Sequence, residues 1–292
     1  MDYRVLDDMN TLIEVREISQ DDMAEFMGVS RLSVSNWLDE KKSIRRANIE
    51  RFYAFAFGSG LRLNSLKKQL YLEEITNEDQ VLLFHGAKTF LDGDIRLDAS
   101  KRKNDFGNGF YCGDNIEQSV MFVATYPESS LYMLRFDRKG LRYKEYFVDR
   151  EWMLTVAYFR GRLDEYKNTN LVQKIQSEVS GLDYVIAPIA DNRMFEIIDQ
   201  FIDGEITDIQ CQHCLSSTNL GKQFVFLSKK SLSNIEVLER CYLSQNEKEY
   251  YLNLRKQEYV VSRDKVKLAR KQFRNQGYYI DEIFDSNQAT SD

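Results

Sequence analysis

A histidine beside a glycine and a later glycine-rich stretch are the features of this sequence that most suggest chemistry. In the strand-like segment VLLFHGAK, the apolar run VLLF is followed by His85 and Gly86, and His85 is one of only two histidines in the chain. Roughly 20 residues later, KNDFGNGFYCGDN carries Gly107, Gly109 and Gly113 around two aromatic residues. A dinucleotide-binding loop requires G-x-G-x-x-G opening a helix, and here the third glycine falls one residue late. These glycines therefore do not predict a phosphate-binding loop of that kind.

A third segment, GKQFVFLS, has the alternation of a β-strand with Gln223 near its start. Taken singly, each of these residues also has an ordinary structural interpretation. A lone histidine on an apolar strand is more often a core residue than a ligand, and the same holds for Tyr111, one of 17 tyrosines. The functional hypothesis therefore rests on the order and spacing of His85, Tyr111 and Gln223 together.

These segments resemble the ADP-ribosyltransferase fold, in its His-Tyr-Glu branch. The string DFGNGFY resembles in particular the bacterial DUF3990 group. The later segment GLDYVIAPIADNRMF is similar to that group's Asp-Tyr-x-x-x-Gly-Pro-x-Ala-Asp pattern, with Ala187 in place of the usual glycine. The resemblance spans about residues 80–235. It implies a split-sheet α+β domain that binds NAD and cleaves its nicotinamide glycosidic bond.

The resemblance also implies roles for individual residues. His85 would hydrogen-bond the adenosine ribose, and Gly86 would offer its backbone groups to the carboxamide. Tyr111 would stack on the nicotinamide ring, with Gly107 and Gly109 allowing the tight turn that places it.

Gln223 stands where the best-known members have a glutamate that holds the nicotinamide-ribose hydroxyl. Glutamine accepts the same hydrogen bond but carries no charge and cannot act as a base. A second carboxylate near the site would compensate, and Asp105 and Asp191 are the candidates, although turn formation explains either one. Phe110 would pack behind the nicotinamide slot.

A second branch of the same superfamily, with an Arg-Ser-Glu signature, is the alternative. LSST at 215–218 resembles its Ser-Thr-Ser strand, and EKE at 247–249 resembles its paired glutamates. Charge pairs between residues i and i+4 of a helix explain EKE equally well.

The N-terminal segment predicts two helices separated by a sharp break. The first starts near Gln20 and ends at Gly28 in the left-handed conformation, and Ser30 caps the second. The string S-Q-x-x-M-A-x-x-M-G-V-S-x-x-x-V-S-x-W resembles the lambda-repressor-like (Xre-type) helix-turn-helix family over about residues 11–62. That resemblance implies that the second helix enters the major groove of DNA. The residues that would contact DNA are Gln20, Arg31, Leu32, Ser33, Asn36, Lys41 and Lys42.

The net charge of the N-terminal module does not favour strong binding to DNA. Residues 1–72 contain 11 basic and 11 acidic residues, so a single copy of this module should bind DNA weakly. We expect binding as a homodimer or together with a partner, and such modules also serve purely in dimerisation or docking. Residues 255–274 form a basic region, with eight Lys or Arg against two acidic residues, which is typical of a solvated helix face and less often of a nucleic-acid contact.

Composition narrows the class of protein. With 43% hydrophobic and 29% charged residues, the chain is an ordinary globular one. No apolar run approaches the ~20 residues of a membrane span, and the first 30 residues lack the apolar core of a signal peptide, so we expect a cytoplasmic protein. The four cysteines form no disulfide framework, and CQHC lacks the second ligand pair of structural zinc. We therefore expect that the protein binds no metal and that its cysteines are free thiols in the core or in loops.

The predicted organisation is an α+β protein in three parts: a helix-turn-helix domain at 1–72, an NAD-binding transferase-like domain at 78–235, and a helical, locally basic region at 236–292. The predicted function is NAD-dependent mono-ADP-ribosyl transfer to a macromolecule, as a toxin or defence effector with a possible antitoxin or inhibitor as partner. One alternative is a transcription regulator whose weakly catalytic domain senses NAD or ADP-ribose. Another is a structural scaffold that uses the helix-turn-helix only for dimerisation and binds no NAD.

Overall fold

The computed structural model describes residues 2–218 and 221–288 and has an α+β fold, as the sequence predicts. The chain divides into two compact units, each assembled from three separate segments of sequence. The first unit contains residues 1–91, 116–136 and 236–255, and the second contains residues 92–115, 137–235 and 256–292. The boundaries of the three predicted domains remain predictions.

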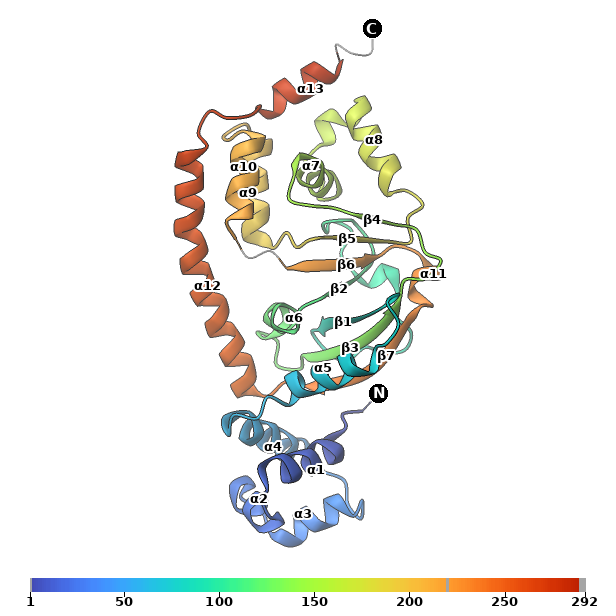
Figure 1. The fold of residues 1–292 in the computed structure, drawn as a ribbon, viewed down its shortest axis with the longest axis vertical. Helices are drawn as coiled ribbons and strands as arrows, with labels where there is room; N and C mark the ends of the chain where they lie inside the picture. The colour runs from blue at the N-terminus through green and yellow to red at the C-terminus, as the bar shows by residue number, and fades with distance from the viewer. Residues whose placement is uncertain (1, 219–220, 289–292) are drawn as a thin grey trace. The chain divides into compact units, whose positions relative to one another are not determined.

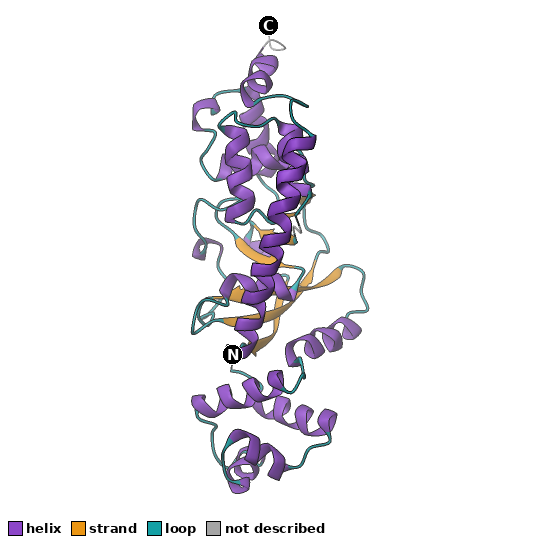
Figure 2. Cartoon of the chain, turned by 90° about the vertical axis from the view of Figure 1, so that its left-hand side faces the viewer, coloured by secondary structure: helices purple, strands orange, loops and turns teal. Residues whose placement is uncertain are grey.

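The first unit begins with five helices and no strand (Figure 2). These helices are α1 (Val5–Arg16), α2 (Gln20–Met27), α3 (Arg31–Leu38), α4 (Arg46–Gly58) and α5 (Leu63–Glu74). Met9, Leu12, Met23, Val34 and Phe52 are fully buried at the centre of the apolar core that α1 to α4 share. Such a core accounts for the folding of helices that are individually too short to be stable in water.

The local signals predicted for α2 and α3 are confirmed. Helix α2 starts at Gln20, and the Ser19 side chain accepts a hydrogen bond from the backbone N–H of Asp22. Gly28 ends this helix in the left-handed conformation, with φ of 63°. Ser30 caps α3 by accepting a hydrogen bond from the N–H of Ser33.

The rest of the first unit is a three-stranded part with helix α6 (Ile116–Val123) and the start of α12 (Gln245–Gln272) up to residue 255 (Figure 1). Its strands, in the order in which they lie, are β1 (Gln80–Ala87), β3 (Ser130–Asp137) and β7 (Ile235–Tyr242). Helix α6 packs on β1, and a second apolar core lies between them. The strand predicted from VLLFHGAK is thus confirmed as β1.

Strand β7 differs from the helical structure that we predicted for residues 236–292. Its sequence IEVLERCY contains β-branched and aromatic residues that suit a strand, and it buries Glu239 and Cys241. The predicted helical character begins only with α12 (Gln245–Gln272) and continues in α13 (Ile280–Gln288). The prediction failed here because Glu239 looks like a solvent-facing residue until its distant partner is known.

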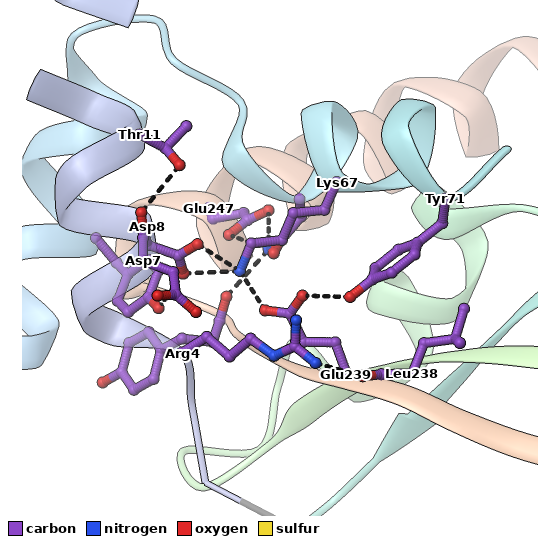
Figure 3. A network of polar contacts seen from close by, with 12 residues as sticks. Arg4, Asp7, Asp8, Thr11, Lys67, Tyr71, Leu238, Glu239 and Glu247 are labelled. Carbon is purple, nitrogen blue, oxygen red and sulfur yellow. Dashed lines mark hydrogen bonds and ion pairs between the residues drawn. The ribbon is translucent and has the colours of Figure 1, made fainter. Parts of the chain in front are cut away.

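That partner is Lys67, which joins the N-terminal helices to β7 (Figure 3). Its ammonium group lies 2.7 Å from Asp8 of α1 and 2.5 Å from Glu239 of β7. Both carboxylates are buried, and the Lys67 side chain is 12% exposed. Tyr53 donates to Asp8, and Tyr71 donates to Glu239 at 3.0 Å. Burial opposes the charged form of Lys67, but the electrostatic effects of Cys241, Asp8 and Glu239 outweigh it and raise the lysine pKa above its ordinary value.

A further buried carboxylate, Glu247, lies at the start of α12 (Figure 3). The Asn64 side chain on α5 donates to Glu247 at 3.0 Å and to the carbonyl oxygen of Tyr242 at 3.0 Å. Burial raises the pKa of Glu247 to about 7, against the opposing effects of Asn64, Arg62 and other basic groups. The first unit therefore holds a carboxyl group that changes its charge near neutral pH.

The second unit is a four-stranded mixed sheet with helices packed on it (Figure 1). Its strands, in spatial order, are β4 (Tyr143–Glu145), β5 (Tyr184–Pro188), β6 (Lys222–Phe226) and β2 (Phe110–Gly113). The first pair is parallel, and the other two pairs are antiparallel. The predicted strand containing Gln223 is thus confirmed as β6.

Helices of the second unit enclose its largest apolar core, which is centred on Trp152, Val185, Phe201 and Val225. They are α7 (Arg150–Phe159), α8 (Asn170–Val179), α9 (Asn192–Ile202), α10 (Asp208–Ser216), α13 and the part of α12 from residue 256 onward. The unit also contains the one-turn helix α11 (Lys229–Leu232). Two single 3-10 turns complete the unit, at Leu97–Ala99 and Asp164–Tyr166.

Replacing Lys67 should strongly destabilise the first unit. Lys67→Met leaves Asp8 and Glu239 buried without their cation, and we expect a loss of about 3–5 kcal/mol in the free energy of unfolding. Urea denaturation measures this loss. Lys42→Met, which removes an exposed lysine, is the control and should change the free energy by less than about 0.5 kcal/mol. Equal stability of the two variants would contradict the assigned role of Lys67.

Glu247 should make stability depend on pH. Because its pKa is higher in the folded than in the unfolded protein, the folded state binds the extra proton between pH 4.5 and about 7, and stability falls as pH rises through this range. Glu247→Gln should abolish a decrease of up to roughly 3 kcal/mol between pH 5 and pH 8. Glu249→Gln, at an exposed position two residues later, should retain it. Identical pH dependence in the Glu247 variant and the wild type would disprove this assignment.

Candidate functional site

The start of β6 carries the polar residue that the sequence singled out. Gln223 is only 6% exposed. Its side-chain nitrogen donates to Asp105 Oδ2 at 2.8 Å and to the carbonyl oxygen of Pro188 at 2.9 Å. A buried amide is stable only when it is hydrogen-bonded, and these two acceptors use both of its N–H groups.

Asp105 lies at the centre of this arrangement, in the loop before the glycine-rich stretch. It is 5% exposed, and both of its oxygens accept hydrogen bonds. Arg160 donates to Oδ1 through Nε at 2.9 Å and through Nη2 at 2.6 Å. The backbone N–H of Ala190 and the Gln223 side chain donate to Oδ2, at 3.1 and 2.8 Å. The carboxylate is therefore ion-paired and fully hydrogen-bonded, as a buried charge requires.

Arg160 is the functional candidate that sequence reasoning missed. It is the C-terminal capping residue of α7, where a positive charge suits the helix dipole. Its guanidinium also donates to the Ala190 carbonyl oxygen and lies 4.1 Å from the centre of the Phe195 ring. Its partner Asp105 is 55 residues away in sequence, so no local pattern could have identified the pair.

Tyr111 closes the glycine-rich loop on itself. Its hydroxyl donates to the carbonyl oxygen of Gly107 at 2.7 Å and accepts from the N–H of Phe106 at 3.2 Å. Burial raises the pKa of this hydroxyl above its ordinary value, so Tyr111 stays neutral at physiological pH. The tyrosine thus has a structural role in this loop whether or not it also contacts a ligand.

The glycines of the loop have steric causes. Gly107 has φ of 72°, a conformation that favours glycine. A side chain at Gly109 would lie 2.8 Å from the carbonyl oxygen of Phe226, because the chain passes close to β6 there. Phe110 is buried, and its ring lies near that of Phe226. These contacts explain why several positions of the glycine-rich stretch, from which an NAD-binding loop was predicted, must be glycine.

His85 and Gly86 lie in the first unit, on β1. The His85 side chain is partly buried, with its ring centre 6.5 Å from that of Tyr132 on β3. A side chain at Gly86 would lie 2.3 Å from the carbonyl oxygen of Ser119, so the close approach of α6 requires glycine at this position. The remaining predicted cofactor residues belong to the second unit.

Other predicted residues have clear structural roles. Asp191 caps α9 by accepting hydrogen bonds from the N–H groups of Arg193 and Met194, which favours its turn-forming interpretation. Cys211 and Cys214 are buried thiols on α10, as predicted. Within residues 2–218 and 221–288, no group of three or more His, Cys, Asp or Glu is arranged to hold a metal ion.

The segments expected from the Arg-Ser-Glu alternative do not have the structure it requires. LSST at 215–218 lies at the C-terminal end of α10 and just beyond it, not on a strand. In EKE, Glu247 is bound to Asn64, and Glu249 accepts a hydrogen bond from Gln245 in the same helix. The structure therefore favours the helical explanation of these residues.

A cavity of about 470 Å³ lies elsewhere in the second unit, between α8 and the first turns of α7 and α10. Two of its lining residues, Glu151 and Glu178, each place a carboxylate oxygen 2.6 Å from Lys144 Nζ. The neighbouring Glu178 raises the pKa of Glu151. None of the predicted site residues lines this cavity.

The residues predicted to contact DNA lie on or next to α2 and α3. Arg31 and Leu32 are exposed on α3, whereas Ser33 and Asn36 are partly buried. Lys41 and Lys42 follow the helix in exposed positions. Two of the cations face acidic neighbours: Arg31 lies 3.6 Å from Asp21, and Lys41 lies 2.9 Å from Asp39.

Fold and site together define an α+β protein with a buried Asp–Arg–Gln network beside a glycine-rich loop. Residues 81–237, more than half of the chain, match the family described as "Protein of unknown function (DUF3990)", and the chain belongs to this family. This confirms the predicted resemblance to DUF3990. No curated protein and no solved structure matches the chain. None of the helices in the described part of the chain combines the length and apolarity needed to cross a bilayer.

Proposed function

We propose that this chain is an NAD-dependent mono-ADP-ribosyltransferase. In this proposal, Tyr111 stacks on the nicotinamide ring, and Gln223 accepts a hydrogen bond from the adjacent ribose. The acceptor of ADP-ribose is a macromolecule, as expected of a toxin or defence effector. The proposal starts from the likeness of the His85, DFGNGFY and Gln223 segments to the His-Tyr-Glu transferases.

The observation that carries the proposal is the pairing of β2 with β6. Tyr111 lies opposite Val225, and Gly113 lies opposite Gln223. Directly opposed residues of antiparallel strands point to the same face, so Tyr111 and Gln223 share one face of the sheet. Gly113 adds no side chain beside Gln223. This is the placement required of a ring platform and a ribose-binding residue that act on one ligand.

The proposed reaction breaks the bond between nicotinamide and ribose through an oxocarbenium-like transition state. Fixed acceptors near the ribose stabilise the positive charge that develops on the sugar. Gln223 supplies a dipole for this purpose and no formal charge. We therefore expect slow turnover that depends on the nucleophilicity of the acceptor.

A sensor of NAD or ADP-ribose is the second candidate, and the pairing of Asp105 with Arg160 favours it. The Asp105 carboxylate, which is bonded to Gln223, is already neutralised by the guanidinium group of Arg160. This network therefore offers no uncompensated negative charge to a developing cation. A ligand would bind there with little acceleration of its cleavage.

Incubation with NAD distinguishes these functions. NAD labelled on the adenylate is supplied with and without cell lysate, and free nicotinamide and the labelled macromolecule are measured. We expect the wild type to release nicotinamide, and Tyr111→Ala and Gln223→Ala should each reduce the rate of release by at least about tenfold. His85→Ala tests whether the histidine of the first unit also contributes to this reaction. Gln173→Ala, at an exposed position of α8, is the control and should retain full activity.

Saturable NAD binding without nicotinamide release would establish the sensor instead. Absence of both binding and release would disprove the assignment of Tyr111 and Gln223 to NAD.

We further propose that α2 and α3 contact DNA, with the exposed Arg31 and Leu32 facing base edges. The support is the short turn at Gly28 between two capped helices and the exposure of the first turn of α3. Because acidic residues balance the basic ones, the affinity of one copy should be low, and binding should require two copies or a partner.

Selection of duplexes from a random DNA library tests this second proposal. We expect recovery of a common sequence at low salt, and Arg31→Ala should weaken binding to it by about 1–3 kcal/mol. Lys265→Ala, on the basic stretch of α12, serves as the control for non-specific electrostatic binding. Recovery of random sequences alone would contradict base recognition by α3.

A further inference from the structure

We infer that Asp105 and Arg160 form a clamp that fixes the orientation of Gln223 and makes glutamine, not glutamate, the residue required at position 223. Gln223 is then the residue that its surroundings require, and not a less effective replacement for the glutamate of the His-Tyr-Glu transferases. Asp105 acts on the ligand only through Gln223 and is a positioning residue. The identity of the ligand rests on the proposed function, whereas the clamp itself does not.

The orientation of the Gln223 amide follows from its partners. Asp105 Oδ2 and the Pro188 carbonyl oxygen are acceptors, so the side-chain nitrogen must face both of them. The oxygen Oε1 consequently points away from these two groups. Among the residues that the structure describes, none donates a hydrogen bond to Oε1. The clamp therefore presents one fixed acceptor, which suits a ligand hydroxyl such as that of a ribose.

A glutamate at this position would meet the same two partners with the wrong charge. One of its oxygens would lie about 2.8 Å from Asp105 Oδ2 and 2.9 Å from the Pro188 carbonyl oxygen, where acceptors repel each other. Like charges in a buried site cannot both remain ionised at that distance. Arg160 does not relieve the conflict, because it contacts the opposite carboxylate oxygen, Oδ1.

The surrounding charges leave Asp105 and Arg160 as the groups that govern position 223. Lys222, the preceding residue, pairs with Glu145 at 2.8 Å. Asp191 is occupied by the N-terminus of α9 and by Arg193. Tyr111, on the same face, stays neutral. A glutamate at 223 would consequently have to be protonated so that it donates to Asp105 as the amide does.

Stability measurements test the clamp without NAD. Gln223→Glu should have a thermal midpoint close to that of the wild type at pH 5.5 and lower by about 3 °C or more at pH 8, because the folded state must hold a proton that the unfolded state releases. Gln173→Glu, the same change at an exposed position, should show no such difference. A Gln223→Glu protein equally stable at both pH values would overturn the inference.

Binding of NAD, followed by calorimetry, tests the consequence for the ligand. At pH 8, Gln223→Glu should weaken binding by about tenfold, as expected for one misplaced buried hydrogen bond, and binding should recover at pH 5.5. Asp105→Asn should weaken NAD binding at both pH values. The NH₂ group of the new asparagine would face groups that donate hydrogen bonds to Asp105, and an amide cannot become an acceptor by a change of protonation. If Gln223→Glu does not fold, Asp105→Asn carries the test, and unchanged NAD affinity in it overturns the inference.

The two proposals fail in different ways. If the wild type binds no NAD, the proposed function fails, while the pH-dependent stability of Gln223→Glu still decides the clamp. If Gln223→Glu binds and cleaves NAD at pH 8 at least as well as the wild type, the clamp fails, and glutamine is a weakened glutamate.

Discussion

The buried carboxylate of Asp105 is the constraint on which the candidate site depends. A charge with 5% exposure needs every oxygen hydrogen-bonded, and the chain meets this need from three places: the end of α7, the turn after β5 and the start of β6. Removal of any one donor leaves the others arranged around an incompletely bonded anion. The position of the glycine-rich loop, which carries Asp105, is thereby tied to the strand that carries Gln223.

In the first unit, Lys67 is likewise a charge removed from water that needs compensating partners, but here the central charge is positive. One buried ammonium group contacts two carboxylates, from α1 and β7, so this cluster carries a formal excess of negative charge. The Asp105 network instead pairs one anion with one cation and completes the bonding with an amide and a backbone N–H. In both arrangements the loss of one partner should cost more than the intact pair contributes, because a buried ion pair seldom outweighs its desolvation, whereas a broken one leaves a buried charge unpaired.

Local features could be read from the sequence, and features that depend on distant partners could not. Gly28 and Ser30 predicted the break between α2 and α3, an apolar run predicted β1, and alternation predicted β6, because caps and hydrophobic patterns act within a few residues. Strand β7 was missed because the burial of Glu239 depends on Lys67, 172 residues earlier. Arg160 was missed for the same reason, and Asp105 was suspected without its link to Gln223, 118 residues away.

The neutrality of the Asp105–Arg160 pair bears on what kind of chemistry position 223 can support. In the proposed reaction, a glutamate would offer a full negative charge to the ribose, but next to Asp105 that charge could persist only at the expense of the neighbouring carboxylate. Glutamine gives up the charge and keeps a fixed acceptor whose direction two partners determine. Rate enhancement by electrostatic stabilisation grows with the charge offered and with its preorganisation. The clamp therefore favours accurate placement of a ligand over strong stabilisation of a cation, and an enzyme built this way depends more on the reactivity of its acceptor.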